Sequence, residues 1–138
     1  MLLGVAVAVF AGLSRVPEPL ELTRARTPRA AEELITGWLP PVRRRAGAAL
    51  VVDLIAFVPL YTALGIALAD EAGDDTWARL GLAGVVAGAA ADVVEDVTAL
   101  AYVRTRSARL VPAMRWAGRA KHLASVALVG LLGLAFLG

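Results

Sequence analysis

The sequence predicts an all-α integral membrane protein with four transmembrane helices and one short amphipathic helix at the membrane surface. Hydrophobic residues make up 59% of the chain and the mean hydropathy is +0.70, whereas soluble domains are about 45–50% apolar. Only 6% of residues are aromatic, so the excess is mainly Ala, Val, Leu and Gly, which favour close packing of membrane helices. The length of 138 residues fits a single membrane domain.

Apolar segments separated by charged ones give the positions of the four predicted transmembrane helices. These segments are residues 1–13, 46–69, 77–103 and 123–138. A helix that spans a bilayer needs about 20 apolar residues, and the 46–69 segment, with Asp53 as its only charge, meets this requirement best. The 1–13 segment is short, so we expect either a short or tilted transmembrane helix or an interfacial segment there.

Between the first two apolar segments, residues 14–45 are predicted to form a basic cytoplasmic segment that contains an amphipathic helix at 28–39. Pro17 and Pro19 are expected to prevent helix formation before it. Thr27 followed by a proline is typical of a helix start. Acidic residues lie on one side of the 28–39 segment and apolar residues recur at helical spacing on the other. Such a helix is expected to lie on the membrane surface.

The distribution of basic residues predicts the orientation in the membrane. Of the 14 Lys and Arg residues, all but Arg79 lie in two segments, 15–45 and 104–121. With four transmembrane helices, both segments lie on one side and the acidic 70–75 turn lies on the other. Cytoplasmic loops are enriched in Lys and Arg. We therefore predict a multi-pass protein of the cell membrane with cytoplasmic basic loops and both termini outward, and the lipid bilayer rather than nucleic acid as its partner.

Several functional classes are excluded by composition. The chain has no cysteine and a single histidine, His122, which excludes disulfides, thiolate metal sites and a multi-histidine metal centre within one chain. Motifs of phosphate-binding loops and zinc proteases are absent from the sequence. No sequence feature supports a Ser-His-Asp triad.

Acidic residues inside the apolar segments are the most informative feature for function. Asp92 and Asp96 are four residues apart and share one helix face, and Glu95 lies about a quarter-turn away. Asp53 and Asp96 lie at a similar depth, roughly 10 Å from the cytoplasmic ends of their helices at 1.5 Å per residue. An ionised carboxylate at the bilayer centre costs about 2.5–3.5 kcal/mol. We therefore expect these acids to pair with cations, bind a metal or a cationic ligand, or be partly protonated.

Partners for these acids are available at the same end of the predicted bundle. Arg119, Lys121 and His122 precede the last apolar segment, and their side chains can turn inward to the acids or outward to lipid headgroups. Tyr61 follows Asp53 by about two helical turns and can offer a hydroxyl group. The predicted site therefore consists of Asp53, Tyr61, Asp92, Glu95, Asp96, Arg119, Lys121 and His122. Within it, Asp92, Glu95 and Asp96 are the predicted ligands of a divalent cation such as Mg²⁺.

Three functions are compatible with this predicted site, and the sequence does not decide whether the protein is an enzyme. The first function is a site for a cation, a proton or a lipid headgroup, in a chain that works with a second copy or another membrane protein. The acids are equally suited to an intramembrane metal-dependent enzyme acting on a lipid-linked phosphate or isoprenoid substrate. The third function is a structural or assembly subunit with a buried ion-pair network.

One resemblance rests on motifs in the second and third apolar segments. The pattern L-D-x-x-F-x-x-x-Y is approximated by Val52–Tyr61, where valine replaces leucine and the phenylalanine comes one residue later. The pattern D-x-x-E-N is matched by Asp92–Asp96, with Asp96 in place of asparagine. Lys121 resembles a lysine that opens the last helix. From residue 20 onwards the chain thus resembles a family of uncharacterised small multi-pass bacterial membrane proteins. The resemblance implies the four-helix architecture and a shared set of site residues, and it implies no activity.

A second resemblance is to the CDP-alcohol phosphotransferases, whose signature is D-x2-D-G-x2-A-R-x8-G-x3-D-x3-D. The corresponding residues here are Glu71, Asp74, Asp75, Ala78, Arg79, Gly88, Asp92 and Asp96. Glu71 replaces the first aspartate and Asp75 replaces the glycine. The resemblance implies that the acids bind two divalent metal ions and that the last aspartate acts as a base.

Overall fold

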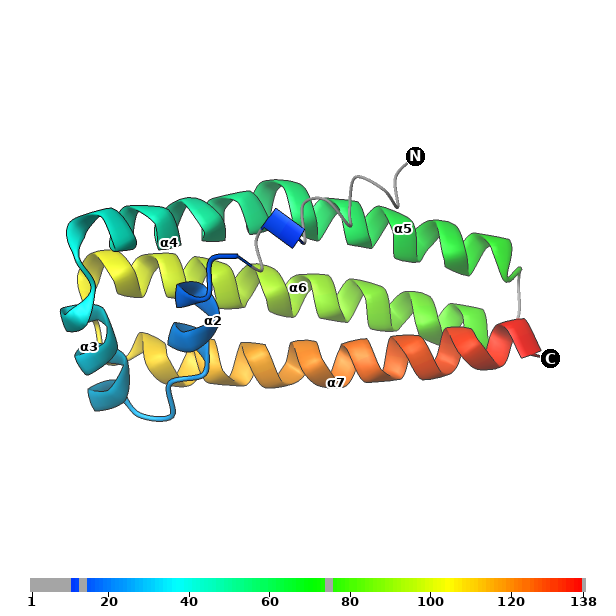
Figure 1. Ribbon diagram of the computed structural model, residues 1–138. Helices are drawn as coiled ribbons and strands as arrows, with labels where there is room; N and C mark the ends of the chain where they lie inside the picture. The colour runs from blue at the N-terminus through cyan, green and yellow to red at the C-terminus, as the bar shows by residue number, and fades with distance from the viewer. Residues whose placement is uncertain (1–10, 13–14, 74–75, 138) are drawn as a thin grey trace.

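The computed structural model describes residues 11–12, 15–73 and 76–137. Two short helices, α2 (Glu18–Thr23) and α3 (Pro28–Gly37), precede three long rods. The first rod joins α4 (Pro40–Val52), the π-helical turn η1 (Asp53–Phe57) and α5 (Val58–Glu71); α6 (Thr76–Thr105) and α7 (Leu110–Leu137) are the others. The rods lie side by side, with α2 and α3 packed near one end (Figure 1). The prediction of an all-helical protein is confirmed for the residues that the structure describes.

The prediction of four transmembrane helices is wrong. Among the described residues, one helix, Pro40–Glu71, is long and apolar enough to cross a membrane. Both of the other rods carry charged residues. Three acids lie within α6, and α7 begins at Leu110 rather than at Leu123, so it includes the basic residues Arg115, Arg119 and Lys121. The fourth predicted helix, at residues 1–13, lies almost entirely outside the described residues.

Prolines begin helices in this chain, including at Pro17 and Pro19, where the sequence predicted that they would prevent helix formation. Helix α2, which was not predicted, has Pro17 as its N-cap and Pro19 in its first turn. Proline is tolerated there because the first amides of a helix have no intrahelical partner. For the same reason α4 can begin with two prolines, Pro40 and Pro41. It starts six residues before residue 46, where the second transmembrane helix was predicted to begin. Helix α3 occupies most of the predicted 28–39 range, and the Thr27 side chain accepts a bond from the Ala30 amide at 3.1 Å.

The π-helical turn η1 lies inside the first rod just before Pro59. A proline within a helix lacks an amide hydrogen and clashes with the carbonyl four residues earlier. The wider turn accommodates this interruption, and the amide of Val58 donates to the carbonyl of Asp53, five residues back. Because Asp53 is the first residue of η1, the turn also sets the direction of its side chain.

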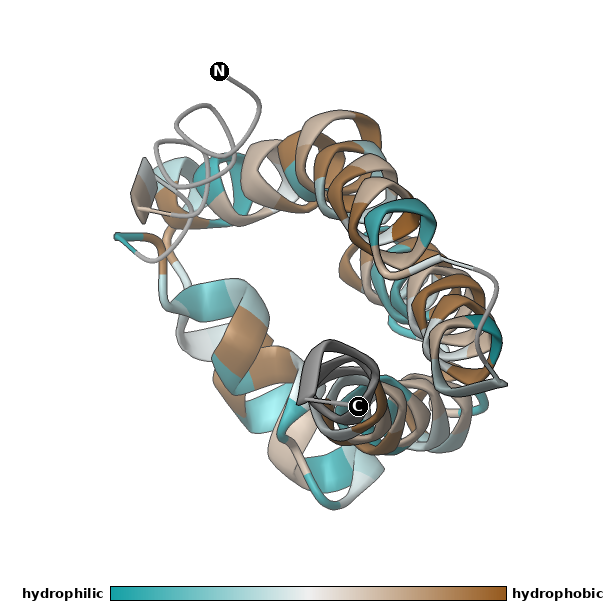
Figure 2. Cartoon of the chain, turned by 90° about the vertical axis from the view of Figure 1, so that its right-hand side faces the viewer, coloured by the Kyte–Doolittle hydropathy of each residue, from teal (hydrophilic) through white to brown (hydrophobic). Residues whose placement is uncertain are grey.

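A buried cluster joins the short helices to the three rods near their basic end. Leu22 of α2 and Ile35 of α3 are fully buried there with Tyr102 of α6 and Met114 of α7. Polar contacts surround this cluster: the Tyr102 hydroxyl donates to Glu32 at 3.3 Å, and Arg106 donates to the same carboxylate at 2.9 Å. The short helices therefore form a fixed layer over one end of the rods. Viewed along their length, the three rods are arranged in an arc, and this layer lies on the concave side of the arc (Figure 2).

Helices α5 and α6 approach closely at Gly65. A Cβ atom at this position would lie 2.6 Å from Cγ2 of Val85, and a β-branched valine has little rotamer freedom to move away. Replacing Gly65 by alanine should therefore lower the free energy of unfolding by about 1–3 kcal/mol through overpacking. The matched control is Gly47→Ala in α4, where the new methyl group has no neighbour within 4 Å. The Gly47→Ala change should instead stabilise the helix by about 0.5–1 kcal/mol. Denaturant titration measures both variants, and equal effects of the two would contradict the close packing of α5 and α6 at Gly65.

Candidate functional site

Helix α6 turns three carboxylates into the interior of the bundle. The exposed fractions are 3% for Asp92, 4% for Glu95 and 2% for Asp96. Their spacing of three and four residues puts them on one helix face. One turn earlier on that face, Gly88 lets α7 approach, since a Cβ there would lie 3.4 Å from Cβ of Ala124. The acids are therefore buried between the helices.

Two side chains of the first rod reach the α6 acids. The Tyr61 hydroxyl donates a hydrogen bond to Asp92 Oδ2 at 3.0 Å. Asp53, half-buried in η1, brings a carboxylate oxygen into a group with one oxygen each of Asp92 and Asp96, all within 4.8 Å of one another. The predicted closeness of Asp53 to Asp96 and the predicted hydroxyl contribution of Tyr61 are therefore both found.

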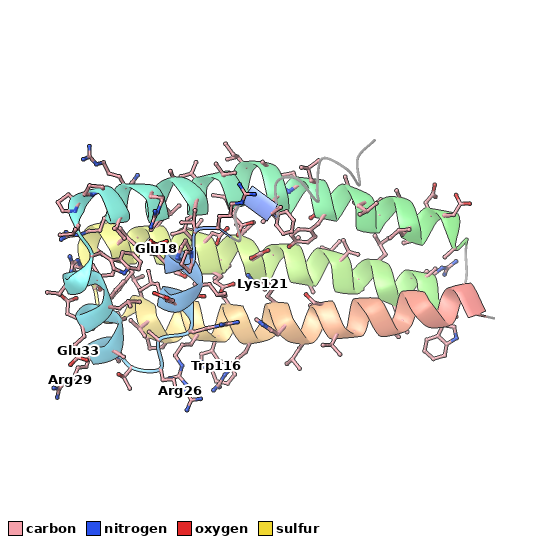
Figure 3. The ribbon with its side chains drawn as sticks, viewed as in Figure 1. Glu18, Arg26, Arg29, Glu33, Trp116 and Lys121 are labelled. Atoms are coloured by element: carbon pink, nitrogen blue, oxygen red, sulfur yellow. The ribbon has the colours of Figure 1, made fainter. Side chains whose placement is uncertain are left out.

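Lys121 joins α7 to these acids. Its ammonium nitrogen lies 2.7 Å from Asp92 Oδ1 and 2.5 Å from Glu95 Oε2, and the side chain enters the space between the rods (Figure 3). Of the two directions expected for this side chain, the structure shows the inward one. Burial alone would lower the pKa of Lys121, but the carboxylates of Glu95 and Asp92 outweigh it and raise that pKa above its ordinary value.

Gly118 is a site residue that the sequence analysis did not identify. A Cβ on this residue would lie 2.8 Å from Glu95 Oε1, so its lack of a side chain makes room for the carboxylate that pairs with Lys121. The spacing from Gly118 to Lys121, three residues on one helix face, is the only sequence signal that could have indicated this role.

The other two basic residues of the predicted site lie differently. The guanidinium of Arg119 is stacked over the ring of Trp116, 5.4 Å from its centroid, on an exposed face of α7. Trp116 itself points away from the rods (Figure 3). His122 is also exposed, and its Nδ1 lies 2.7 Å from the carbonyl oxygen of Gly118. Lys121 is therefore the member of this group that pairs with the acids.

The ammonium group of Lys121 pairs with only two of the four carboxylates at the site. Lys121 contacts Asp92 and Glu95, whereas Oδ1 of Asp53 and Oδ2 of Asp96 are buried and have no hydrogen-bond partner among the described residues. Burial raises the pKa of the Asp96 carboxyl group to about 8, and the charges of Asp53 and Asp92 add to this effect. These two buried oxygens need a proton or a cation, because an unsatisfied buried acceptor costs about 1–3 kcal/mol.

Three of the carboxylates fit the geometry of a divalent metal ion. Hard cations such as Ca²⁺ bind carboxylate oxygens at about 2.3–2.6 Å, so one ion can contact oxygens that lie within 4.8 Å of one another. The oxygens in this position belong to Asp53, Asp92 and Asp96. The predicted metal ligands included Glu95 instead of Asp53; in the structure Glu95 is the ion-pair partner of Lys121.

A cavity of about 680 Å³ opens beside the carboxylates. Helix α2, the first rod, α6 and α7 all contribute to its walls. Apolar side chains dominate the lining, among them Leu20, Leu50, Phe57 and Val126, while the four acids, Lys121 and His122 supply its charged part. The rings of Phe57 and Tyr61 lie against each other there, with centroids 5.4 Å apart. This size and mixture of surfaces are typical of small-molecule binding sites.

Comparisons with known proteins identify no relative of this chain. No protein-family model, curated protein or solved structure matches the chain.

Proposed function

We propose that this protein binds a cation at the carboxylates of Asp53, Asp92 and Asp96. The observation that carries the proposal is the group of three carboxylate oxygens within 4.8 Å of one another, two of whose side chains have a buried oxygen without a hydrogen-bond partner. Oxygen ligands of this kind favour hard divalent cations such as Mg²⁺, Mn²⁺ and Ca²⁺.

The arrangement of charges favours a binding site over a purely structural ion-pair network. A structural network needs every buried charge to be paired, because a half-satisfied network is worse than an apolar core. Here Lys121 forms ion pairs with Asp92 and Glu95. Asp53 and Asp96 each have a buried oxygen with no hydrogen-bond partner among the described residues. A bound cation completes the set.

We further propose that the protein works at the cell membrane, with the basic end of the bundle in the cytoplasm. Among the described residues, Pro40–Glu71 is the helix long and apolar enough to cross the bilayer, and only 17% of its most apolar stretch is buried inside the protein. Exposed apolar side chains such as Val52, Ile55 and Ile66 lie along it. The start of α4, the end of α6 and the start of α7 share one end of the bundle (Figure 1), which brings the two basic segments together as the positive-inside rule expects. A second copy or another membrane protein is the proposed partner.

Cation-dependent thermal stability tests the proposed site. Purified protein in a neutral detergent should melt at a higher temperature as Mn²⁺, Mg²⁺ or Ca²⁺ is added, because a ligand that binds only the folded state stabilises it by about 2.7 kcal/mol at 100 times its Kd. Asp53→Asn and Asp96→Asn should each remove this dependence. The matched control is Asp70→Asn, an exposed acid at the far end of α5, which should keep it.

The quantity to compare is the shift caused by the cation, not the starting melting temperature. Replacing Asp96 by asparagine removes a buried charge and can by itself stabilise the protein. If the three variants and the unmodified protein respond equally to the cations, or if none responds, the carboxylates are not a cation site.

A further inference from the structure

The cavity beside the carboxylates is much larger than a metal ion needs. A water molecule occupies about 30 Å³ in the liquid, so a cation with its remaining water ligands would fill only a small part of about 680 Å³. The rest is lined by apolar side chains such as Leu20, Phe57 and Val126. This surface matches a hydrocarbon group and not an ion.

The charge at the inner end of the cavity selects the sign of a ligand's polar head. Four carboxylates line the cavity against one lysine and one histidine. Lys121 is already held by Asp92 and Glu95. An anionic head would therefore meet uncompensated carboxylates, whereas a cationic head would neutralise them.

The buried oxygens select the kind of cation. Asp96 is only 2% exposed, and its Oδ2, like Oδ1 of Asp53, has no hydrogen-bond partner among the described residues. Such oxygens need N–H or O–H donors. A primary ammonium group supplies three donors, while a quaternary ammonium group carries the same charge and supplies none.

We propose that the ligand of this cavity is an amphiphilic primary amine, with its ammonium group between Asp53 and Asp96 and its hydrocarbon part against Leu20, Phe57 and Val126. This inference rests on the proposed cation site and names the cation as the head of a larger molecule. The ammonium group donates to the two unpartnered oxygens. The rings of Phe57 and Tyr61 line the cavity beside them and add a favourable surface for a cation.

Calorimetric titration with octylamine tests this inference directly. The purified protein in a neutral detergent should bind octylamine, and octyltrimethylammonium at least about tenfold more weakly, because it lacks donors for the buried oxygens. Octanoate should not bind. Asp96→Asn should weaken octylamine binding by at least about tenfold, and octylamine should displace Mn²⁺ from the unmodified protein.

A pair of variants on α7 tests the apolar half of the cavity without changing the acids. Val126 and Leu123 are each 73% exposed, but only Val126 is among the lining residues. Val126→Trp should weaken octylamine binding by about tenfold or more and leave Mn²⁺ affinity unchanged. Leu123→Trp adds a similar ring outside the cavity, so it should change neither, and it also controls for partitioning of octylamine into detergent.

The outcomes separate this inference from the cation site on which it rests. If Mn²⁺ binds in a manner that depends on Asp96 while octylamine neither binds nor competes, the ligand is a bare ion and the amine proposal is overturned. Equal binding of octylamine and octyltrimethylammonium would likewise overturn the role of the buried oxygens. If neither Mn²⁺ nor octylamine binds, the proposed cation site itself is wrong.

Discussion

Replacing Lys121 by methionine should lower the free energy of unfolding by about 3–5 kcal/mol, the usual cost of removing one partner from a buried ion pair. Methionine keeps much of the length of the side chain and removes its charge. Asp92 and Glu95, 3% and 4% exposed, would lose the ammonium group that lies 2.7 Å and 2.5 Å away. Denaturant titration measures the effect, because burying an uncompensated carboxylate is much more costly than losing an exposed ion pair.

The charge dependence of this loss distinguishes it from a simple packing defect. Adding Asp92→Asn and Glu95→Gln to the Lys121→Met variant should restore most of the stability, because the neutral amides need no counter-ion. Arg119→Met is the matched control on the same helix, since Arg119 is exposed and stacks on Trp116; it should cost less than about 1 kcal/mol. A Lys121→Met variant as stable as the control would show that the acids are neutral or differently paired.

Replacing Ile35 by alanine should lower the free energy of unfolding by about 2–5 kcal/mol, as is typical for large-to-small substitutions in a core. Ile35 is fully buried where α3 meets the rods, in the same cluster as Leu22 and Met114. Hydrogen exchange should also become faster in α2 and α3 than in the rods, because these helices are held mainly by this cluster.

The control for the Ile35 variant lies just after α3. Leu39 is 69% exposed, so Leu39→Ala should change the free energy of unfolding by no more than about 0.5 kcal/mol. A small effect of Ile35→Ala, similar to that of Leu39→Ala, would contradict the packing of α3 against the rods.

Helical periodicity predicted the parts of the site that one helix determines by itself. Asp92 and Asp96 share a face because they are four residues apart, and the cost of burying charge made it necessary for them to have partners. The depth estimate counted Asp53 from residue 46, whereas α4 begins at Pro40, so the closeness of Asp53 to Asp96 is a result of packing between helices and not of that count. The arguments about α6 held because they use geometry and chemistry within one helix.

Features that depend on packing between helices could not be read from the sequence. Arg119 and Lys121 are both basic and two residues apart, and only the rotation of α7 against α6 decides that Lys121 reaches the acids while Arg119 lies over Trp116. The role of Gly118 depends on where the Glu95 carboxylate lies. The apolar segment 123–138 was also misleading, because α7 begins at Leu110 and includes basic residues that precede this segment.

The most direct test of the cation site is the number of Mn²⁺ ions bound per chain, measured from the free-ion signal in electron paramagnetic resonance. The unmodified protein should bind one Mn²⁺ ion per chain at a saturable site. The double variant Asp53→Asn/Asp96→Asn should bind none, and Asp70→Asn should bind like the unmodified protein. Saturable binding that persists in the double variant, or no binding by the unmodified protein, would contradict a cation site at these carboxylates.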